Sequence, residues 1–271
     1  MVYEIIVEGG ESRLMALFKG QNLEKIGPVR SSRHYFLDYA LENDAIYVHY
    51  GWSPQAQYDI SNLGVNNING ISESESSFWR VKDKRAPHNV ATSTAKILSI
   101  AERKGYKTTS TKESVLKYVT DEVELTDGQS AEKITIPYSY SNDVEYTYDA
   151  TTKRYQRYSK GVKETDWSTE ENITTKNIII TFAKNSVLND GENKDRQTLS
   201  NIGTLNGYYI TNGKAIKITC EKTSRSAQTV YKDLDGNEIK VNDGNTYVQI
   251  CPINAKVTIE GAEETVTEDV D

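Results

Sequence analysis

Apolar and polar positions alternate at the start of the chain, as they do in a strand with one wet face. The alternation predicts strands over residues 3–8 and 13–18, joined by Glu-Gly-Gly-Glu-Ser. Gly9 and Gly10 supply the positive φ values that a tight hairpin needs. We therefore expect the chain to open with a hairpin.

After a Gly-Pro turn at residues 27–28 the pattern becomes that of a helix. We expect this helix to run from about Ser32 to Asn43. Tyr35-Phe36-Leu37 and Tyr39-Ala40-Leu41 cover so much of its surface that burial on two sides is expected.

A short interior strand is expected over residues 45–50, followed by a second helix. Ser53 fits its N-cap, Pro54 its first position and Gly64 its end. A helix N-terminus near the carboxyl end of a strand is a common ligand position in open α/β sheets.

Three further features complete the first half. Residues 66–77 are predicted to form a polar loop, and residues 78–89 form an aromatic and basic segment too charged to be core. Thr92 or Ser93 caps a helix that runs through about Lys104. Residues 111–119 are expected to form one more short helix.

The second half consists of short alternating segments separated by turn signals such as Asn212-Gly213 and Asp243-Gly244. We expect strands over residues 144–148, 154–158, 177–182, 207–211, 215–219, 229–232 and 246–250. The predicted fold class is an α/β (α+β) N-terminal domain followed by a mostly antiparallel β C-terminal domain. The expected divisions are an α/β domain over 1–122, a linker over 123–132, a β domain over 133–260 and an acidic disordered tail over 261–271.

Composition narrows the class of protein. The 271 residues carry a net charge of −7, which argues against a general nucleic-acid binder. No apolar run approaches the roughly 18–20 residues that cross a bilayer. Because Met1 leads directly into an expected strand, we expect the natural protein to begin before this chain.

The chain has two cysteines, Cys220 and Cys251, and each ends an expected strand. A disulfide between them and two buried thiols are equally compatible with these positions.

Basic side chains at the expected start of the first long helix are the main functional signal. Arg30, Arg33 and His34 would lie in or beside its first turn, where free N–H groups already carry partial positive charge. Cations in that position are favoured when an anion shares the site. The anion is either internal, such as Glu8 or Glu11, or a ligand.

A second basic segment extends this candidate site. We expect a pocket for an anionic ligand, bordered by Glu8 and Arg13; its expected members are Arg30, Arg33, His34, Arg80, Arg85, His88 and Asn89. The spacing of the three histidines matches no metal motif, so no metal site is expected, and no catalytic residue is assigned. The alternative is that the same arginines are paired internally and the histidines are structural.

Several pieces of the chain resemble the YerB-like family of bacterial lipoproteins, which has no established biochemical function. The pieces that carry the resemblance are residues 7–13, 27–33, 45–49, 51–54, 78–80, 86–89, 148–157 and 176–180. The resemblance implies an α/β domain followed by a β domain, outside the cytoplasmic membrane of a Gram-positive-type bacterium. The family's lipoprotein signal and opening strand do not appear before the first hairpin here, and Cys220 stands where Trp is expected. A lipid anchor would therefore precede this chain in the full-length protein.

The order of a hairpin, a Pro-Val-Arg turn, a strand and a helix also resembles the LytR-CpsA-Psr cell-wall ligases. Those enzymes hold a polyprenyl pyrophosphate with arginines and a magnesium ion, but their acidic metal ligands have no counterpart that we can place on this sequence. We therefore carry three hypotheses: an envelope protein that binds an anionic small molecule or cell-wall precursor, with no cofactor; an enzyme that uses Mg²⁺ on such a precursor; and a structural lipoprotein that binds an envelope protein partner.

Overall fold

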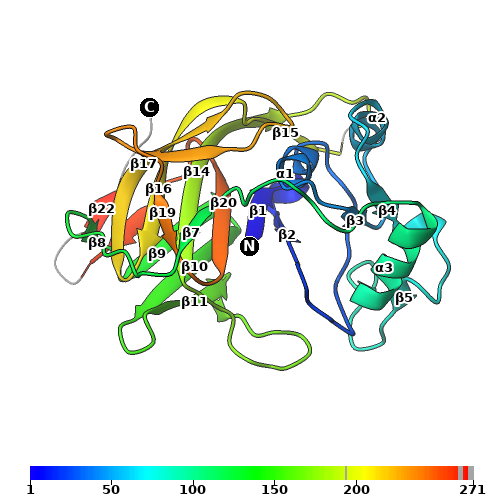
Figure 1. Ribbon diagram of the computed structural model, residues 1–271, viewed down its shortest axis with the longest axis horizontal. Helices are drawn as coiled ribbons and strands as arrows, with labels where there is room; N and C mark the ends of the chain where they lie inside the picture. Colours follow the sequence, from blue (N-terminus) through cyan, green and yellow to red (C-terminus); the bar gives the residue numbers. More distant parts are fainter. Residues whose placement is uncertain (193, 262–264, 268–271) are drawn as a thin grey trace. The chain divides into compact units, whose positions relative to one another are not determined.

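The computed structural model describes residues 1–192, 194–261 and 265–267. The chain forms two compact units, labelled by their elements in Figure 1. The β-sandwich unit comprises Met1–Ala16, Val115–Ser224 and Gln228–Asp271, and the α/β unit comprises Leu17–Ser114 with Arg225–Ala227. The structure confirms the predicted fold class, an α/β part followed by a mostly β part. It also places the opening hairpin in the sheet of the β-sandwich unit.

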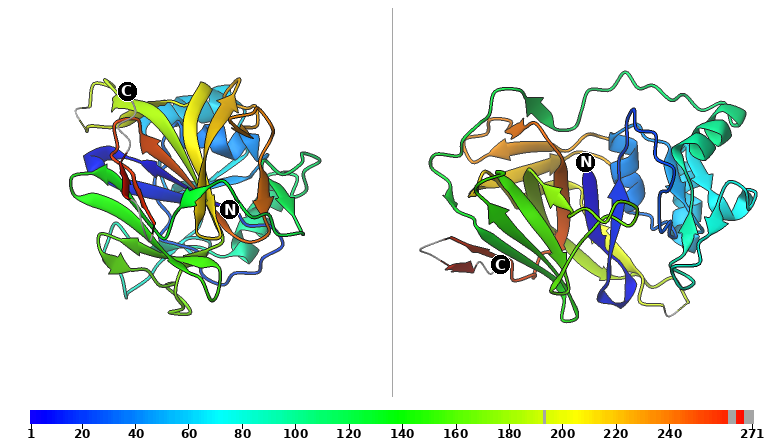
Figure 2. Two further views of the ribbon diagram at one scale, coloured as in Figure 1. Left: turned by 90° about the vertical axis from the view of Figure 1, so that its left-hand side faces the viewer. Right: turned by 90° about the horizontal axis from the view of Figure 1, so that it is seen from below.

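Two sheets build the β-sandwich unit, and their strands form separate layers in Figure 2. The first sheet has the order β18-β17-β16-β14-β20-β1-β2, with β15 paired to β14 and β8 to β17. Its strands are β1 (Val2–Ile6), β2 (Ser12–Ala16), β8 (Gln129–Ser130), β14 (Asn177–Val187), β15 (Gln197–Ser200), β16 (Gly203–Thr211), β17 (Lys214–Lys222), β18 (Val230–Asp233) and β20 (Thr246–Pro252). The opening hairpin is confirmed, with Gly9 and Gly10 at φ values of 70° and 72°.

The second sheet has the order β12-β11-β10-β9-β21-β22, with β13 paired to β11. Its strands are β9 (Lys133–Ser139), β10 (Asn142–Asp149), β11 (Arg154–Ser159), β12 (Val162–Lys163), β13 (Thr174–Thr175), β21 (Thr258–Glu260) and β22 (Thr265–Thr267). The acidic tail expected over 261–271 lies largely outside the described residues, apart from β22.

Alternation in the sequence explains how the two sheets share a core. Ile134, Ile136 and Tyr138 are the buried positions of β9, whereas the residues between them are only half-buried. These side chains belong to one apolar cluster with Ile178 and Ile180 of β14 in the other sheet. The core of this unit therefore lies between its two sheets.

The centre of the first sheet is buried along whole strands. All of β20 and the first seven residues of β14 are buried, and β20 pairs in parallel with both β14 and β1. Parallel strands covered on both faces give continuous apolar runs, which explains Ile178-Ile179-Ile180. The strand from the beginning of the chain thus lies beside one from its end.

A charged network is buried in this unit. Glu4 on β1 is 1% exposed and Arg157 on β11 is 2% exposed. Arg157 Nη2 donates to Glu4 Oε2 over 2.7 Å, and Gln249 Nε2 donates to the same oxygen over 3.1 Å. Tyr138 OH donates to Gln249 Oε1 over 2.8 Å. Arg157 is also paired with the partly exposed Glu164. Strands of both sheets therefore contribute to one buried, ion-paired network.

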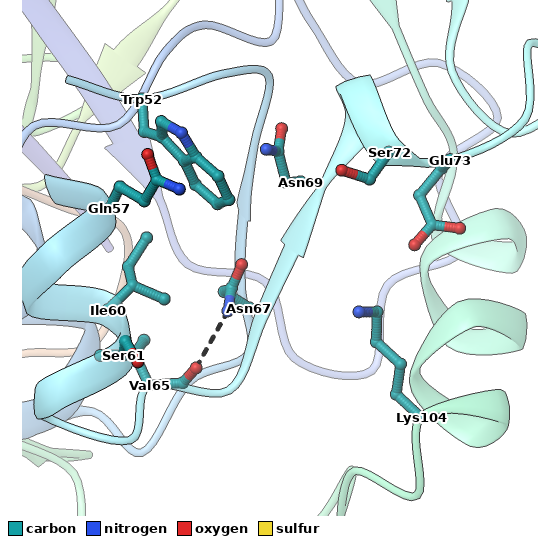
Figure 3. Close-up of a pocket in the computed structure, with 10 residues that line it drawn as sticks. All are labelled: Trp52, Gln57, Ile60, Ser61, Val65, Asn67, Asn69, Ser72, Glu73 and Lys104. Carbon is teal, nitrogen blue, oxygen red and sulfur yellow. Dashed lines mark hydrogen bonds between the residues drawn. The ribbon is translucent and has the colours of Figure 1, made fainter. Parts of the chain in front are cut away.

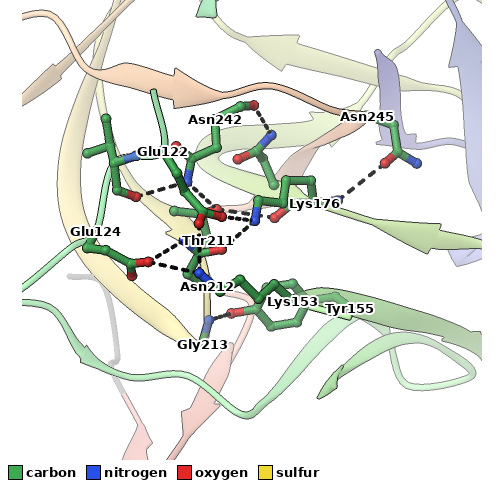
Figure 4. Close-up of polar contacts among 12 residues, drawn as sticks. Glu122, Glu124, Lys153, Tyr155, Lys176, Thr211, Asn212, Gly213, Asn242 and Asn245 are labelled. Carbon is green, nitrogen blue, oxygen red and sulfur yellow. Dashed lines mark hydrogen bonds and ion pairs between the residues drawn. The ribbon is translucent and has the colours of Figure 1, made fainter. Parts of the chain in front are cut away.

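The expected linker is bonded to the β-sandwich unit along part of its length (Figure 4). Asn242 Oδ1 accepts from Val123 N over 2.7 Å, and Glu124 Oε1 accepts from Lys153 Nζ over 3.3 Å. The neighbouring Glu122 is bonded by Lys153 and Lys176, and these contacts lower the pKa of its carboxyl to about 2.

Three helices and two strand pairs belong to the α/β unit as the structure describes it. Their bounds are α1 (Phe36–Glu42), β3 (Tyr47–His49), α2 (Pro54–Asn62), β4 (Asn67–Asn69), η2 (Gly70–Ser72), β5 (Trp79–Arg80), β6 (Val90–Ala91) and α3 (Thr94–Arg103). Strands β7 (Lys117–Val119) and β19 (Lys240–Asn242) pair with each other within the β-sandwich unit. Ile68, Phe78, Val90 and Ile100 form the apolar cluster of the α/β unit. The expected caps are confirmed, because Ser53 accepts from Ala56 N and Ser93 accepts from Lys96 N.

Two local predictions are wrong. Residues 111–119 form no helix, because Val115 and Leu116 are buried and Lys117–Val119 pairs in parallel with β19. The polar loop expected over 66–77 contains β4, whose backbone pairs in parallel with β3. In both places the backbone N–H and C=O groups bond to a strand elsewhere in the sequence, which the local pattern does not indicate.

The two cysteines are free thiols and form no disulfide. Cys220 and Cys251 are both free and buried, and their strands β17 and β20 are separated in the sheet by β16 and β14. Burial raises the pKa of the Cys220 thiol to about 12, opposed by the hydrogen bond from Thr181. Neither thiol therefore has the character of a reactive cysteine.

Candidate functional site

The segment over residues 26–32 is extended, and this changes the expected position of the basic cluster. Val29 N donates to Val90 O over 2.8 Å, and Tyr50 N donates to Arg30 O over 2.9 Å. Ser32 N donates to Gly51 O over 2.9 Å. Because this backbone bonds to Val90 on one side and to residues 50–51 on the other, the helix cannot begin at Ser32.

The first long helix therefore starts four residues later than predicted, at Phe36. Its N-cap, Tyr35, makes no capping hydrogen bond through its side chain. Arg30 lies in extended chain, and Arg33 and His34 precede the helix. These three residues do not lie in a first helical turn, so the prediction based on their charge at that position is wrong. What each of them can bind depends on the groups that surround it.

One group of basic residues gathers at the loop between β5 and β6. Arg30 Nη1 donates to Pro87 O over 2.7 Å, which brings Arg30 to this loop. Arg80 Nη1 donates to Asn89 Oδ1 over 2.7 Å, and Asn89 Nδ2 donates to Val81 O over 3.2 Å. We call residues 80–89 together with Arg30 the basic loop.

The basic loop presents charge to solvent. Arg80, Arg85 and His88 are exposed, whereas Asn89 is buried and bonds the two ends of the loop to each other. The guanidinium of Arg80 lies 5.9 Å from the ring centre of Tyr50. Among the residues that the structure describes, the side chains of Arg85 and His88 make no hydrogen bond or ion pair.

Arg33 and His34 belong to a different group. Arg33 is 7% exposed, and its Nη1 donates to Ser32 O over 2.7 Å. Burial lowers the pKa of His34; the positive charges of Arg225 and Arg33 lower it further, and Asp59 opposes them.

Arg225 is the centre of this second group, which we call the Arg225 cluster: Arg225, Asp38, Asp59, His34 and Arg33. Arg225 Nε donates to Asp38 Oδ1 and its Nη1 to Asp59 Oδ2, both over 2.6 Å. Its Nη2 donates to His34 O over 2.8 Å. Sequence reasoning missed Arg225, because it lies almost two hundred residues from Asp38.

The two remaining candidates lie in the β-sandwich unit. Arg13 Nη2 is 3.8 Å from Glu8 Oε1 at the opening hairpin. Glu11, considered as an internal partner for the arginines, accepts from Lys160 over 2.7 Å instead.

Strands β3 and β4 position a third polar group that the sequence did not reveal. His49 is 1% exposed; its Nδ1 lies 2.8 Å from Gly51 O and its Nε2 lies 3.1 Å from Asn67 Oδ1. Burial lowers the pKa of His49, and these two contacts oppose the shift. The only available signal was the Asn-Ile-Asn alternation of β4, which lies between two glycines.

Trp52 and β4 border a hollow of about 460 Å³ within the α/β unit (Figure 3). No group of three or more His, Cys, Asp or Glu side chains is arranged to hold a metal ion in the described part of the chain.

Comparison with known proteins gives the family. Residues 1–107 match the profile of the N-terminal domain of a protein of unknown function, DUF3048, and residues 134–248 match the profile of its C-terminal domain. The chain belongs to the DUF3048 family. The N-terminal DUF3048 profile includes the opening hairpin, which the structure pairs with β20 of the β-sandwich unit.

A relative in the DUF3048 family is the protein of Bacillus subtilis (strain 168) named "Putative lipoprotein YerB". It is 30% identical over 260 residues, which cover 93% of this chain and 74% of that protein. The crystal structure of YerB matches with a TM-score of 0.82 at 30% identity, covering 94% of this chain and 85% of the other. The resemblance to YerB-like proteins is thus confirmed. Among the described residues of this DUF3048 chain, no helix is long and apolar enough to span a membrane.

Proposed function

We propose that this chain is an extracytoplasmic protein of the cell envelope, anchored to the membrane by lipid in its full-length form. Its α/β unit binds an anionic, phosphate-bearing ligand at the basic loop. The proposed location rests on the lipoprotein name of the relative from Bacillus subtilis. The proposed ligand rests on the chemistry of the loop itself.

The observation that carries the proposal is the exposed charge of the basic loop. Residues 80–89 contain four lysine or arginine side chains and one acidic side chain, in a protein whose net charge is −7. Arg80 bonds to the neutral amide of Asn89, so this contact leaves its positive charge uncompensated. Guanidinium groups recognise phosphate oxygens through paired donors, which fits an anionic ligand.

The fold holds this charge in place. Asn89 joins the two ends of the loop, and Arg30 bonds to the carbonyl of Pro87. Charges that are already ordered lose less conformational entropy on binding than charges on a mobile loop. Arg33 and His34, by contrast, lie in the Arg225 cluster, so the proposal assigns ligand contact to Arg30, Arg80, Arg85 and His88.

Binding of inorganic pyrophosphate and of vesicles containing phosphatidylglycerol tests the proposal. We expect binding that weakens as salt rises and that falls at least about tenfold in Arg80→Ala/Arg85→Ala. Lys107→Ala removes an exposed positive charge elsewhere in the same unit and should leave binding unchanged. Binding only to vesicles would identify a lipid headgroup as the source of the phosphate.

Failure of both probes to bind would refute the proposal. Equal loss in the double variant and in Lys107→Ala would also refute it, because net charge alone would then account for the attraction. The Mg²⁺-dependent enzyme and the protein-partner hypotheses remain predictions from the sequence.

A further inference from the structure

The hollow beside Trp52 is a second candidate site in the α/β unit, and it shares no residue with the basic loop. Its volume of about 460 Å³ lies within the range typical of small-molecule sites. Helix α2, strand β4 and the turn after it, and the end of α3 all contribute to it (Figure 3). Side chains that argue for a ligand are Trp52, Gln57, Ile60, Ser61, Asn69 and Ser72.

Asn69 is the most informative of these residues. It is 7% exposed, and its Oδ1 already accepts from Gly51 N over 2.9 Å and from Ile71 N over 3.2 Å. These bonds fix the carboxamide, and its Nδ2 donates to no group among the described residues. Figure 3 shows this amide at the hollow, beside Trp52. This donor group is open to the hollow, where a ligand or water can accept its hydrogen bond.

Neighbouring aromatic rings hold the Trp52 side chain in place. The rings of Trp52 and His49 have centres 5.5 Å apart, and His49 stacks in turn on Tyr47 at 5.3 Å. His49 is itself fixed by Gly51 O and Asn67 Oδ1. Asn67 also borders the hollow, and its Nδ2 donates to Val65 O over 3.2 Å. The indole is therefore a preorganised platform rather than a mobile surface side chain.

Half of the residues that line the hollow are polar without being charged. Gln57, Ser61 and Ser72 expose an amide and two hydroxyls, and within the described ranges these side chains bond to no protein group. The charges are at one side: Glu73 is paired with Arg103, and Lys104 lies 5.9 Å from the ring centre of Tyr106. A strongly charged ligand would find little to compensate it beyond Lys104.

An indole face, an aliphatic side chain and a set of neutral donors and acceptors match the chemistry of a sugar ring. The C–H face of a pyranose is apolar and packs on an aromatic ring, whereas its hydroxyls need both donors and acceptors at the edge. Ile60 and Trp52 supply the apolar contact, and the amides and hydroxyls supply the polar one. We propose that this hollow is a carbohydrate-binding site for a neutral pyranose unit.

Calorimetric titration and saturation-transfer NMR with three neutral disaccharides test the site: N,N′-diacetylchitobiose, cellobiose and maltose. We expect at least one to bind, with affinity reduced at least about tenfold by Trp52→Ala and also by Gln57→Ala. Gln57 is exposed, so its substitution tests the contact without risk to the fold. Signals transferred to the sugar should come from indole protons in the unmodified protein and vanish in Trp52→Ala.

Tyr58→Ala is the matched control. Tyr58 is an aromatic residue on the same helix, 64% exposed and outside the hollow, so its loss should not change sugar affinity. Failure of all three disaccharides to bind would overturn the proposal, as would equal loss in Tyr58→Ala or retained affinity in Trp52→Ala. Arg80→Ala/Arg85→Ala should keep sugar binding, which separates this outcome from that of the phosphate experiment.

Discussion

Two arginines, one in each unit, have opposite surroundings, although they look alike in the sequence. Arg157 in the β-sandwich unit is 2% exposed and bonds to the buried carboxylate of Glu4. Arg85 of the basic loop is exposed, and its side chain bonds to nothing in the described part of the protein. The first arginine satisfies a charge within the fold, whereas the second leaves its charge available to a ligand. Position in the fold, rather than residue type, therefore separates structural from candidate binding arginines.

The largest expected effect comes from breaking the buried pair. Arg157→Met leaves Glu4 buried without its cation, and we expect a loss of about 3–5 kcal/mol in the free energy of unfolding. Urea denaturation followed by circular dichroism measures the loss. The double variant Glu4→Gln/Arg157→Met should recover part of it, because the fully buried carboxylate is then neutral and the carboxylate left without its cation is that of Glu164, which also pairs with Arg157 and is 31% exposed.

Arg85→Ala provides the contrast and should change stability by no more than about 0.5 kcal/mol. A cost for Arg157→Met as small as that of Arg85→Ala would contradict the distinction between these two arginines.

Arg225 gives an intermediate case, because its side chain is 33% exposed and bonds to two buried carboxylates. Arg225→Ala leaves Asp38 and Asp59 without this donor, and we expect a loss of about 1–3 kcal/mol, toward the lower end because water reaches the site. Hydrogen exchange should show faster opening of α1 and α2. If exchange in both helices is unchanged, the Arg225 cluster contributes nothing to the stability of the α/β unit.

The smallest effect depends on pH. Burial lowers the pKa values of His34 and His49, so the folded protein binds fewer protons than the unfolded chain below the ordinary pKa of about 6.5. Stability should therefore fall as the pH decreases from about 7 to 5. His49→Gln should flatten part of this decline in denaturation experiments across that range. An unchanged slope in the variant would show that His49 does not contribute.

Local signals predicted the local structure well. The caps Ser53 and Ser93 and the hairpin glycines act within a few residues of themselves, so their outcome depends little on the rest of the fold. The strand expected over residues 144–148 lies within β10, whose alternation likewise needs only a buried face to form. These features gave the two-part architecture.

Tertiary partners explain what the sequence did not show. A helix was expected to begin at about Ser32, but the backbone of residues 30–32 bonds to residues 50–53, which no local pattern indicates. Arg225 reaches Asp38 across most of the chain, and the Asn69 amide becomes informative only when its oxygen is seen to be occupied. Candidate residues could thus be named by type, but their grouping into separate sites required the fold.

The parallel pairing of β1 with β20 has a consequence for how this protein is made. Strand β1 ends at residue 6 and its neighbour begins at residue 246, so the centre of the first sheet cannot form until nearly all of the chain has been synthesised. Residues 17–114 form one compact unit, which Arg225–Ala227 joins from later in the chain. We expect the α/β unit to fold first during synthesis. The edge of β1 that pairs with β20 stays unpaired until β20 has been synthesised.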